Sequence, residues 1–188
     1  MTMTVVLDAN VLYPQHICDL FLNFADAKLI RPVWSDWIHD EWMRNVLKSK
    51  PQLDPAKIER RKQMMDRAFP DALVHEFEVL VDTIEGVHKK DRHVMAVAIR
   101  ARADSIVTFN MKDFSAAAQS QYGISVIHPD QLMLKLIRMN ESMVIDTIRI
   151  VRRHLKNPPI SAEHLLAIYE RSGLHRSVAV LTPFLDRF

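Results

Sequence analysis

Four acidic residues occupy positions that suit metal-dependent chemistry in a layered α/β protein. Asp8 follows the β-rich run "TVVL", and Asp113 comes soon after a second such run, "SIVTF". Asp91 opens the helical run "RHVMAVAIRARA", and Glu41 lies in the middle of "DWIHDEWMRNVLKS". Functional groups of an open parallel sheet gather outside the carboxyl ends of its strands. We therefore expect Asp8, Asp91 and Asp113 to converge at one sheet edge, with Glu41 projecting into the same crevice.

Clustered carboxylates raise one another's pKa values unless a cation neutralises them. Oxygen ligands suit a hard ion, which predicts Mg²⁺, with Mn²⁺ also possible. The sequence predicts Asp8 and Asp91 as direct ligands of the ion. Asp113 is expected to complete the site directly or through a metal-bound water, and Glu41 to act mostly through a water. A water activated in such a site can attack a phosphodiester, so Asp8, Glu41, Asp91 and Asp113 are the predicted catalytic residues.

The elements that must position these acids alternate between strand and helix. Short buried strands are expected at 4–8, 105–109 and 124–127, with a brief strand possible near 28–35. Helices are expected from Pro14 to about residue 27, after Ser35, after Asp54, from 71 to about 84, from Asp91, and from Pro129. This order favours an α/β fold with a parallel sheet. Beyond about residue 139 the pattern is entirely helical, so we expect an α/β domain at 1–138 and a helical extension at 139–188.

Composition limits the class of protein. The 188 residues, 48% of them hydrophobic, fit one globular domain with a small appendage. No apolar run approaches the roughly 20 residues that span a bilayer, and the N-terminus lacks the features of a signal peptide. The single cysteine, Cys18, argues against a disulfide framework and a Cys-based zinc site. We expect a cytoplasmic protein.

Basic residues are placed where they could attract a polyanion. Residues 1–130 hold 16 Lys and Arg against 18 Asp and Glu, whereas residues 131–188 hold 9 against 5. A nucleic acid must pass the repulsion of an acidic crevice, so a cationic rim is expected. The predicted RNA-binding residues flank Asp91 or share one helix: Lys89, Lys90, Arg92, Lys57, Arg60 and Arg61. Trp34, Trp37 and Trp42 are expected in a core or an interface.

Several of these stretches together resemble the PIN-domain family of metal-dependent nucleases. The matching text is "VVLDANVLYP" (5–14), "WSDWIHDEW" (34–42), "KDRHVMAVAIRARADSIVT" (90–108), "FNMKDF" (109–114) and "YGISVIHPDQL" (122–132). The similarity is greatest to the toxin half of VapBC-type toxin–antitoxin pairs, in a subgroup with a helical C-terminal extension. It implies a three-layer α/β/α fold with a central parallel sheet.

The resemblance also assigns roles to residues. The family's metal-binding acids fall on Asp8, Glu41 and Asp91, and Asn10, Thr108 and His93 match supporting positions. The family's fourth acid commonly lies two residues after the Thr, where this chain has Asn110. Asn110 offers a carbonyl oxygen but no charge. Asp113, three residues further on, is the alternative source of the carboxylate.

The implied activity is that of a Mg²⁺-dependent endoribonuclease, the toxin of a type II toxin–antitoxin system. The implied partners are an RNA substrate, a small antitoxin protein and a second copy in a homodimer, with no membrane. Two alternatives remain open. A phosphatase of the haloacid-dehalogenase type shares the strand–Asp start but needs a second Asp where this chain has Asn10. A PIN-fold binding module without activity is favoured only by Asn110.

Overall fold

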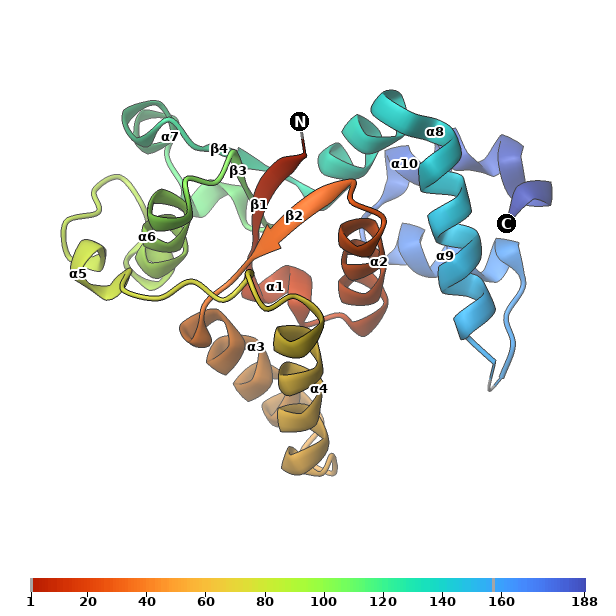
Figure 1. Ribbon diagram of the computed structural model, residues 1–188, viewed down its shortest axis with the longest axis horizontal. Helices are drawn as coiled ribbons and strands as arrows, with labels where there is room; N and C mark the ends of the chain where they lie inside the picture. The colour runs from red at the N-terminus through yellow and green to blue at the C-terminus, as the bar shows by residue number, and fades with distance from the viewer. Residues whose placement is uncertain (1, 157) are drawn as a thin grey trace.

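A parallel four-stranded sheet lies at the centre of the computed structural model, which describes residues 2–156 and 158–188 (Figure 1). The strands follow the order β2-β1-β3-β4. They span Met3–Leu7 (β1), Ile30–Val33 (β2), Ser105–Val107 (β3) and Ser125–Ile127 (β4). All three strand pairings are parallel. The carboxyl ends therefore lie at one edge of the sheet, as the sequence predicted.

Helices cover both sides of this sheet. In Figure 1, α5 (Glu78–Val81), α6 (Arg92–Ala101) and α7 (Ala116–Tyr122) lie to the left of the sheet. To the right lie α2 (Gln15–Asp26), α8 (Pro129–His154), α9 (Ala162–Arg171) and α10 (His175–Leu181). Below it lie α1 (Ala9–Leu12), α3 (Asp36–Ser49) and α4 (Pro55–Ala68). Three 3₁₀ turns complete the described elements: η1 (Lys89–Asp91), η2 (Met111–Asp113) and η3 (Thr182–Arg187). The predicted α/β layers are confirmed.

Local sequence signals account for where several helices begin. The Ser35 hydroxyl accepts a hydrogen bond from the Ile38 N–H and caps α3. The Asp54 carboxylate caps α4 by accepting from the Ala56 N–H, and Pro55 takes the first helical position. Both residues use side-chain oxygens to satisfy backbone N–H groups that the first turn leaves unpaired. No helix within the described residues, the long α8 included, is apolar enough over a sufficient length to cross a membrane.

The predicted helix from 71 to about 84 is wrong except for its single turn α5. Residues 72–74 are extended instead and run beside Trp34, whose N–H donates to the Ala72 carbonyl and whose carbonyl accepts from the Val74 N–H. Glu76 then has a positive φ of 58°, which a helix does not allow. Pairing with the end of β2 satisfies the backbone groups that the helix would have used, and the β-branched residues nearby favour extended structure.

A buried polar network fixes α3 against α4. The Asp66 carboxylate accepts from Trp34 Nε1 at 2.9 Å and contacts His39 Nε2 at 3.0 Å. Trp42 Nε1 donates to His39 Nδ1 at 2.8 Å, so Nδ1 is the acceptor and Nε2 carries the proton toward Asp66. Because His39 and both indoles are buried, this network sets the rotation of α3 about its own axis. That rotation determines where Glu41 points.

The C-terminal residues form the predicted helical region, joined to the sheet domain through α8. Inside α8, Asn140 has non-helical angles (φ −159°, ψ 79°), and its side-chain oxygen accepts from the Met143 N–H. The buried Asp130 carboxylate accepts from the Arg176 and Ser177 N–H groups, which ties the start of α10 to α8. The predicted division between residues 138 and 139 falls next to the break at Asn140 and stays a prediction.

Candidate active site

Asp8 lies at the carboxyl end of β1, in the middle of the sheet, and only 2% of its surface is exposed. Its Oδ1 atom accepts from the Ala9 N–H at 2.7 Å, where it caps the short helix α1. Its Oδ2 atom accepts from Asn10 Nδ2 and from Thr108 Oγ1, each at 2.7 Å. Three donors thus hold one carboxylate in a single orientation at the edge where the sequence predicted it.

Asn10 and Thr108 bind each other as well as Asp8. Asn10 Nδ2 lies 2.8 Å from Thr108 Oγ1, and the Asn10 carbonyl oxygen accepts from the Phe109 N–H at 3.0 Å. Thr108 Oγ1 also accepts from the Asn110 N–H at 3.0 Å. These contacts join the ends of β1 and β3. They give Asn10 and Thr108 the supporting positions that the family resemblance implied.

The carboxyl groups of the site raise one another's pKa values. Burial raises the pKa of Asp8 to about 7, against a lowering by the Thr108 hydrogen bond, and Glu41 and Asp91 raise it further. Burial and the nearby Asp91 raise the pKa of Glu41. Burial and the nearby Asp113 raise the pKa of Asp91. Asp8, Glu41 and Asp91 are thus near enough to influence one another electrostatically, and Asp113 influences Asp91. The convergence of all four carboxylates stays a prediction.

Glu41 reaches the site from α3, and Asp91 reaches it from the start of α6. Glu41 Oε2 lies 3.7 Å from Nε2 of His93, which is buried in the first turn of α6. Asp91 Oδ2 lies 3.3 Å from His88 Nδ1. Asp91 occupies the N-cap position of α6, yet its side chain makes no capping hydrogen bond there. Its carboxylate therefore serves the crevice rather than the helix end.

Asp113 and Asn110 differ in their surroundings. Asp113 is half-buried in η2 and is close enough to raise the pKa of Asp91. The Asp113 carbonyl accepts from the His88 N–H at 2.8 Å, which brings η2 beside the turn that carries Asp91. Asn110 is exposed. The placement favours Asp113 as the fourth carboxylate, and the assignment stays a prediction.

The donor set fits a hard divalent ion in its chemistry. Burial and mutual repulsion disfavour the ionised form of several carboxyl groups in this site. A bound cation would stabilise that ionised form. Within residues 2–156 and 158–188, however, no group of three or more His, Cys, Asp or Glu side chains is positioned to hold a metal ion. Mg²⁺ often binds through one or two carboxylates and keeps several waters. The arrangement therefore fits an ion held by two acids better than a three-carboxylate cage.

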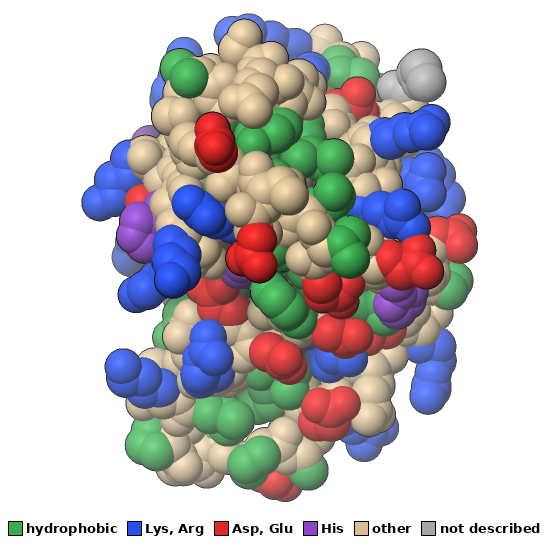
Figure 2. Space-filling view, turned by 90° about the vertical axis from the view of Figure 1, so that its left-hand side faces the viewer, with side chains coloured by type: hydrophobic (Ala, Val, Ile, Leu, Met, Phe, Trp, Pro, Cys, Tyr) green, Lys and Arg blue, Asp and Glu red, His purple; other side chains and the backbone are tan. Residues whose placement is uncertain are grey.

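The predicted RNA-binding residues occupy two separate places. Lys89, Lys90 and Arg92 flank Asp91, and the Lys90 charge lowers the pKa values of both Glu41 and Asp91. Figure 2 shows the face on the side of α5, α6 and α7, where acidic side chains gather near the middle and many Lys and Arg side chains lie toward the margins. Lys89 and Lys90 are exposed, and the cationic rim stays a prediction.

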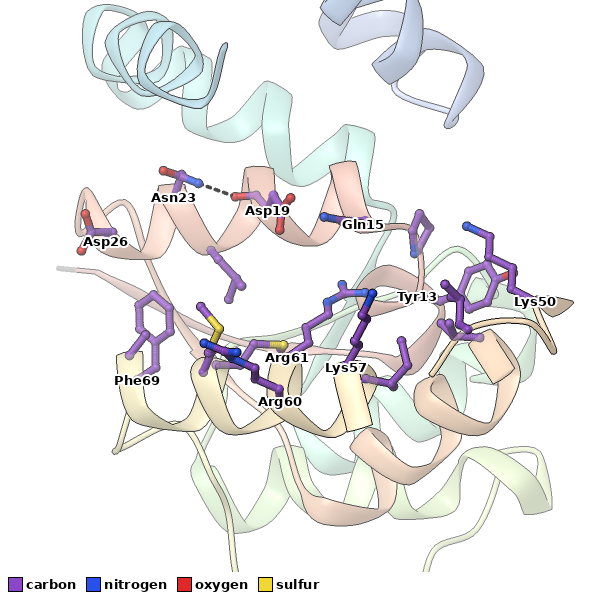
Figure 3. Close-up of a pocket in the computed structure, with 18 residues that line it drawn as sticks. Tyr13, Gln15, Asp19, Asn23, Asp26, Lys50, Lys57, Arg60, Arg61 and Phe69 are labelled. Atoms are coloured by element: carbon purple, nitrogen blue, oxygen red, sulfur yellow. Dashed lines mark hydrogen bonds between the residues drawn. The ribbon is translucent and has the colours of Figure 1, made fainter. Parts of the chain in front are cut away.

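The second group lines a different groove, between α2 and α4, of about 740 Å³ (Figure 3). Lys57, Arg60 and Arg61 contribute to its α4 side, and Asp19 and Asp26 to its α2 side. None of the four predicted catalytic acids lines this groove. Because the groove does not include the acids, RNA binding by Lys57, Arg60 and Arg61 stays a prediction and needs a separate test.

Arg61 has a structural position within this groove. Its guanidinium donates to the Leu12 carbonyl at 2.7 Å and lies 4.7 Å from the centre of the Trp42 ring. It is half-buried. These contacts connect α1, α3 and α4. They use the guanidinium group of Arg61, which the sequence predicted to bind RNA.

Sequence reasoning missed three residues that surround Glu41. Trp37, Arg44 and Asn45 line a cavity of about 590 Å³ together with Glu41, Lys90 and His93. The sequence favours a core or an interface for Trp37, yet 44% of its surface is exposed. Spacings of four, three and four residues from Glu41 place these side chains on its helix face. That spacing is the signal that could have identified them.

Comparisons with known proteins concern parts of this chain. Residues 129–183 match the family described as the VapC50 C-terminal domain. A Mycobacterium tuberculosis protein named "Putative ribonuclease VapC50" is 38% identical over 79 residues, which is 42% of this chain. The matched segment covers 47% of that relative, so the chain matches about half of its length. No solved structure matches the chain.

Two independent observations now point the same way. Asp8, its partners Asn10 and Thr108, and the parallel sheet follow the pattern quoted for PIN-domain nucleases, whereas Asn110 departs from it. The C-terminal helices match a domain named after a VapC protein. The comparisons and the fold thereby confirm that this chain resembles the VapC-type PIN-domain nucleases.

Proposed function

We propose that this protein is a Mg²⁺-dependent endoribonuclease. The observation that supports it most directly is Asp8 at the carboxyl end of β1, which Asn10 and Thr108 hold in place and which Glu41 and Asp91 influence electrostatically. Asp8 and Asp91 would hold the ion, with Asp113 contributing directly or through a water. When bound, Mg²⁺ polarises the phosphoryl oxygen and lowers the pKa of water.

The protein's own groups have separable tasks in this reaction. Asn10 and Thr108 keep the Asp8 carboxylate in one orientation, so the site does not have to reorganise when substrate arrives. Lys89 and Lys90 attract the RNA backbone past the acidic crevice. Burial and the nearby Asp91 raise the pKa of Glu41, which favours its uptake of a proton and suits it to act as a general base toward the attacking water.

The haloacid-dehalogenase alternative finds no support in the position of Asn10. That chemistry requires a second acid two residues after the first, ready to exchange a proton. Here the Asn10 amide donates to Asp8 and its carbonyl accepts from Phe109. Both the amide group and the carbonyl oxygen of the Asn10 side chain are therefore already hydrogen-bonded within the site.

The biological role that we propose is that of the toxin in a toxin–antitoxin pair, with a small antitoxin as partner and a homodimer as the working form. Expression of the chain alone should slow bacterial growth, and co-expression of the small protein encoded beside it should restore growth. The Asp91→Asn variant should have no effect on growth in either case. Growth inhibition that persists in Asp91→Asn would separate toxicity from the proposed site.

RNA cleavage tests the enzymatic part directly. The full chain should cut a 5′-labelled RNA in the presence of Mg²⁺ and leave it intact in EDTA. Asp8→Asn and Asp91→Asn should each lower the cleavage rate at least a hundredfold, roughly the loss of one strong transition-state interaction, while an exposed control, Asp82→Asn, should cleave at the wild-type rate. Near wild-type cleavage by either acid variant would exclude this site.

A further inference from the structure

The cavity of about 590 Å³ beside Glu41 has features that the cleavage chemistry does not use. Its lining comes from α3 and from the start of α6, including Trp37, Glu41, Arg44, Lys90 and His93. Glu41 lines this cavity and is near enough to Asp91 to have its pKa raised by it, so the cavity adjoins the acidic site. A cavity of this size is within the range of small-ligand sites.

Trp37 presents an aromatic surface at this cavity. Its ring is held on one side by the edge of Phe77, with ring centres 5.3 Å apart and planes at 85°, and by His93 at 6.0 Å. Trp34 and Trp42 are both fully buried and donate their indole N–H groups to Asp66 and His39. Trp37 is 44% exposed. A flat ring, buttressed yet open, is the surface on which a nucleobase stacks.

His93 supplies an unsatisfied polar atom at the same cavity. The residue is only 8% exposed, and its Nε2 atom has no hydrogen-bond partner in the described part of the chain. The nearest acid, Glu41 Oε2, is 3.7 Å away, which is beyond hydrogen-bond distance. Buried polar atoms in native proteins nearly always have partners. The Nε2 atom therefore points to a ligand that brings a polar group into the cavity.

Two positively charged side chains line the cavity from different elements. Arg44 is exposed on α3, and Lys90 is exposed on the turn before α6. Asp40 also lines the cavity, so the lining is not uniformly basic, and a purely anionic ligand would meet repulsion from Asp40 and Glu41. An aromatic platform, one polar atom and two separate cations match one nucleotide, with its base on the ring and its phosphate near the cations.

We propose that this cavity is a nucleobase subsite, in which an unpaired base of an RNA strand stacks on Trp37 and places a polar edge at His93 Nε2. The phosphate of that nucleotide lies toward Arg44 and Lys90, and the strand continues past Glu41 to the acidic site. The proposal rests on the proposed ribonuclease function. It adds a recognition element for single-stranded RNA, since a base paired in a duplex has no free face for the ring.

RNA binding by the full chain tests this subsite. All proteins would carry Asp8→Asn, so that a short unstructured RNA labelled with fluorescein stays intact during anisotropy measurements. Trp37→Ala should raise the Kd about 5- to 150-fold, the range for one stacked base. Trp37→Phe, which keeps an aromatic ring, should stay within about fivefold of the parent. Ile150→Ala removes an exposed apolar side chain of α8 and should leave the Kd unchanged.

A series of RNAs with single abasic positions separates stacking from effects on the fold. With Trp37 present, one abasic position should weaken binding far more than its neighbours. In Trp37→Ala the same abasic position should cause no further loss. If the two losses simply add, or if Trp37→Ala binds RNA as tightly as its parent, the subsite is refuted.

The outcome also distinguishes this inference from the proposed function. RNA cleavage that depends on Asp91 but is indifferent to Trp37 would leave the ribonuclease intact and remove the subsite. A wild-type chain that neither binds nor cuts RNA would remove both. Loss of antitoxin binding in Trp37→Ala, with RNA affinity unchanged, would overturn the proposal in favour of a protein-binding surface.

Discussion

Replacing Asp8 by Asn should stabilise the metal-free protein while it abolishes cleavage. The substitution removes a charge that the folded protein buries beside two other acids. The folded pKa of about 7 lies above the ordinary value of 3.8. Above pH 7 this difference corresponds to roughly 4 kcal/mol of folding free energy that the charged Asp8 costs.

The substitution also has a cost that the hydrogen bonds reveal. The two carboxylate oxygens accept from Ala9, Asn10 and Thr108. The amide of Asn at position 8 has only one acceptor oxygen, and its NH₂ group takes the place of the other. That NH₂ group would face an N–H donor and could not accept its hydrogen bond. Thr108 can reverse its hydroxyl, whereas Ala9 and Asn10 cannot reverse their N–H groups. Losing one such bond costs about 1 kcal/mol, which leaves a net gain of about 2–3 kcal/mol at about pH 8.

The pH dependence identifies the origin of this gain. Asp8 holds its proton more tightly when folded, so the wild-type unfolding free energy should fall as the pH rises from about 4 to 7. The amide of the Asp8→Asn variant has no proton to lose. The advantage of the variant should therefore be near zero at about pH 4.5, grow through this window and level off above about pH 7.

Urea unfolding in EDTA, followed by far-UV circular dichroism between about pH 4.5 and 8, measures this curve. The exposed Asp82→Asn serves as a matched control and should follow the wild type at every pH. Addition of Mg²⁺ should then stabilise the wild type and not Asp8→Asn, because a ligand that binds only the folded state raises its stability. An advantage that does not change with pH, or a variant less stable than the wild type at the alkaline end, would refute the reasoning.

Three further sets of variants test other parts of the structure. Asp113→Ala should weaken Mg²⁺ binding in calorimetry and slow cleavage severely, whereas Asn110→Asp should tighten Mg²⁺ binding; a silent Asp113→Ala beside an inactive Asn110→Ala would give the fourth position to Asn110. Thr108→Val should lower the unfolding free energy by about 1–3 kcal/mol and cleavage more than roughly tenfold, and Thr108→Ser should recover most of both. Arg61→Gln should lower the thermal midpoint with little change in RNA affinity, whereas Lys90→Gln should weaken RNA binding and reduce its logarithmic salt dependence by about one; the opposite result would place Arg61 on the RNA path.

The predictable parts of this protein depend on short-range signals. The strand expected at 4–8 spans residues 3–7, and the caps at Ser35 and Asp54 lie where they were expected. Each of these signals is contained within a few residues of sequence. The helix from 71 to 84 failed because its first residues pair with Trp34, about 40 positions earlier in the chain. Local propensity does not register such a partner.

The site shows the same limit. Asn10 and Thr108 bind each other across 98 positions. The family resemblance marked both as supporting positions, but it did not predict that they contact each other. Three tryptophans lie close together in the sequence and look alike there, yet only Trp37 is exposed. Helix rotation, set by the network around His39, decides which of them faces water. Because that rotation arises from packing between helices, a single helix pattern cannot supply it.

The packing of Phe109 links the completion of the site to the order of synthesis. Phe109 follows Thr108, and its N–H binds Asn10. Its ring packs edge-on against His128 at 5.0 Å, and an added methyl group on Gly173 would come within 3.3 Å of it. In a nascent chain that does not yet include residue 173, the packing contact on this side of the Phe109 ring is missing. The loop that carries Phe109 thus gains this packing partner only from a segment made about 60 residues later in the chain.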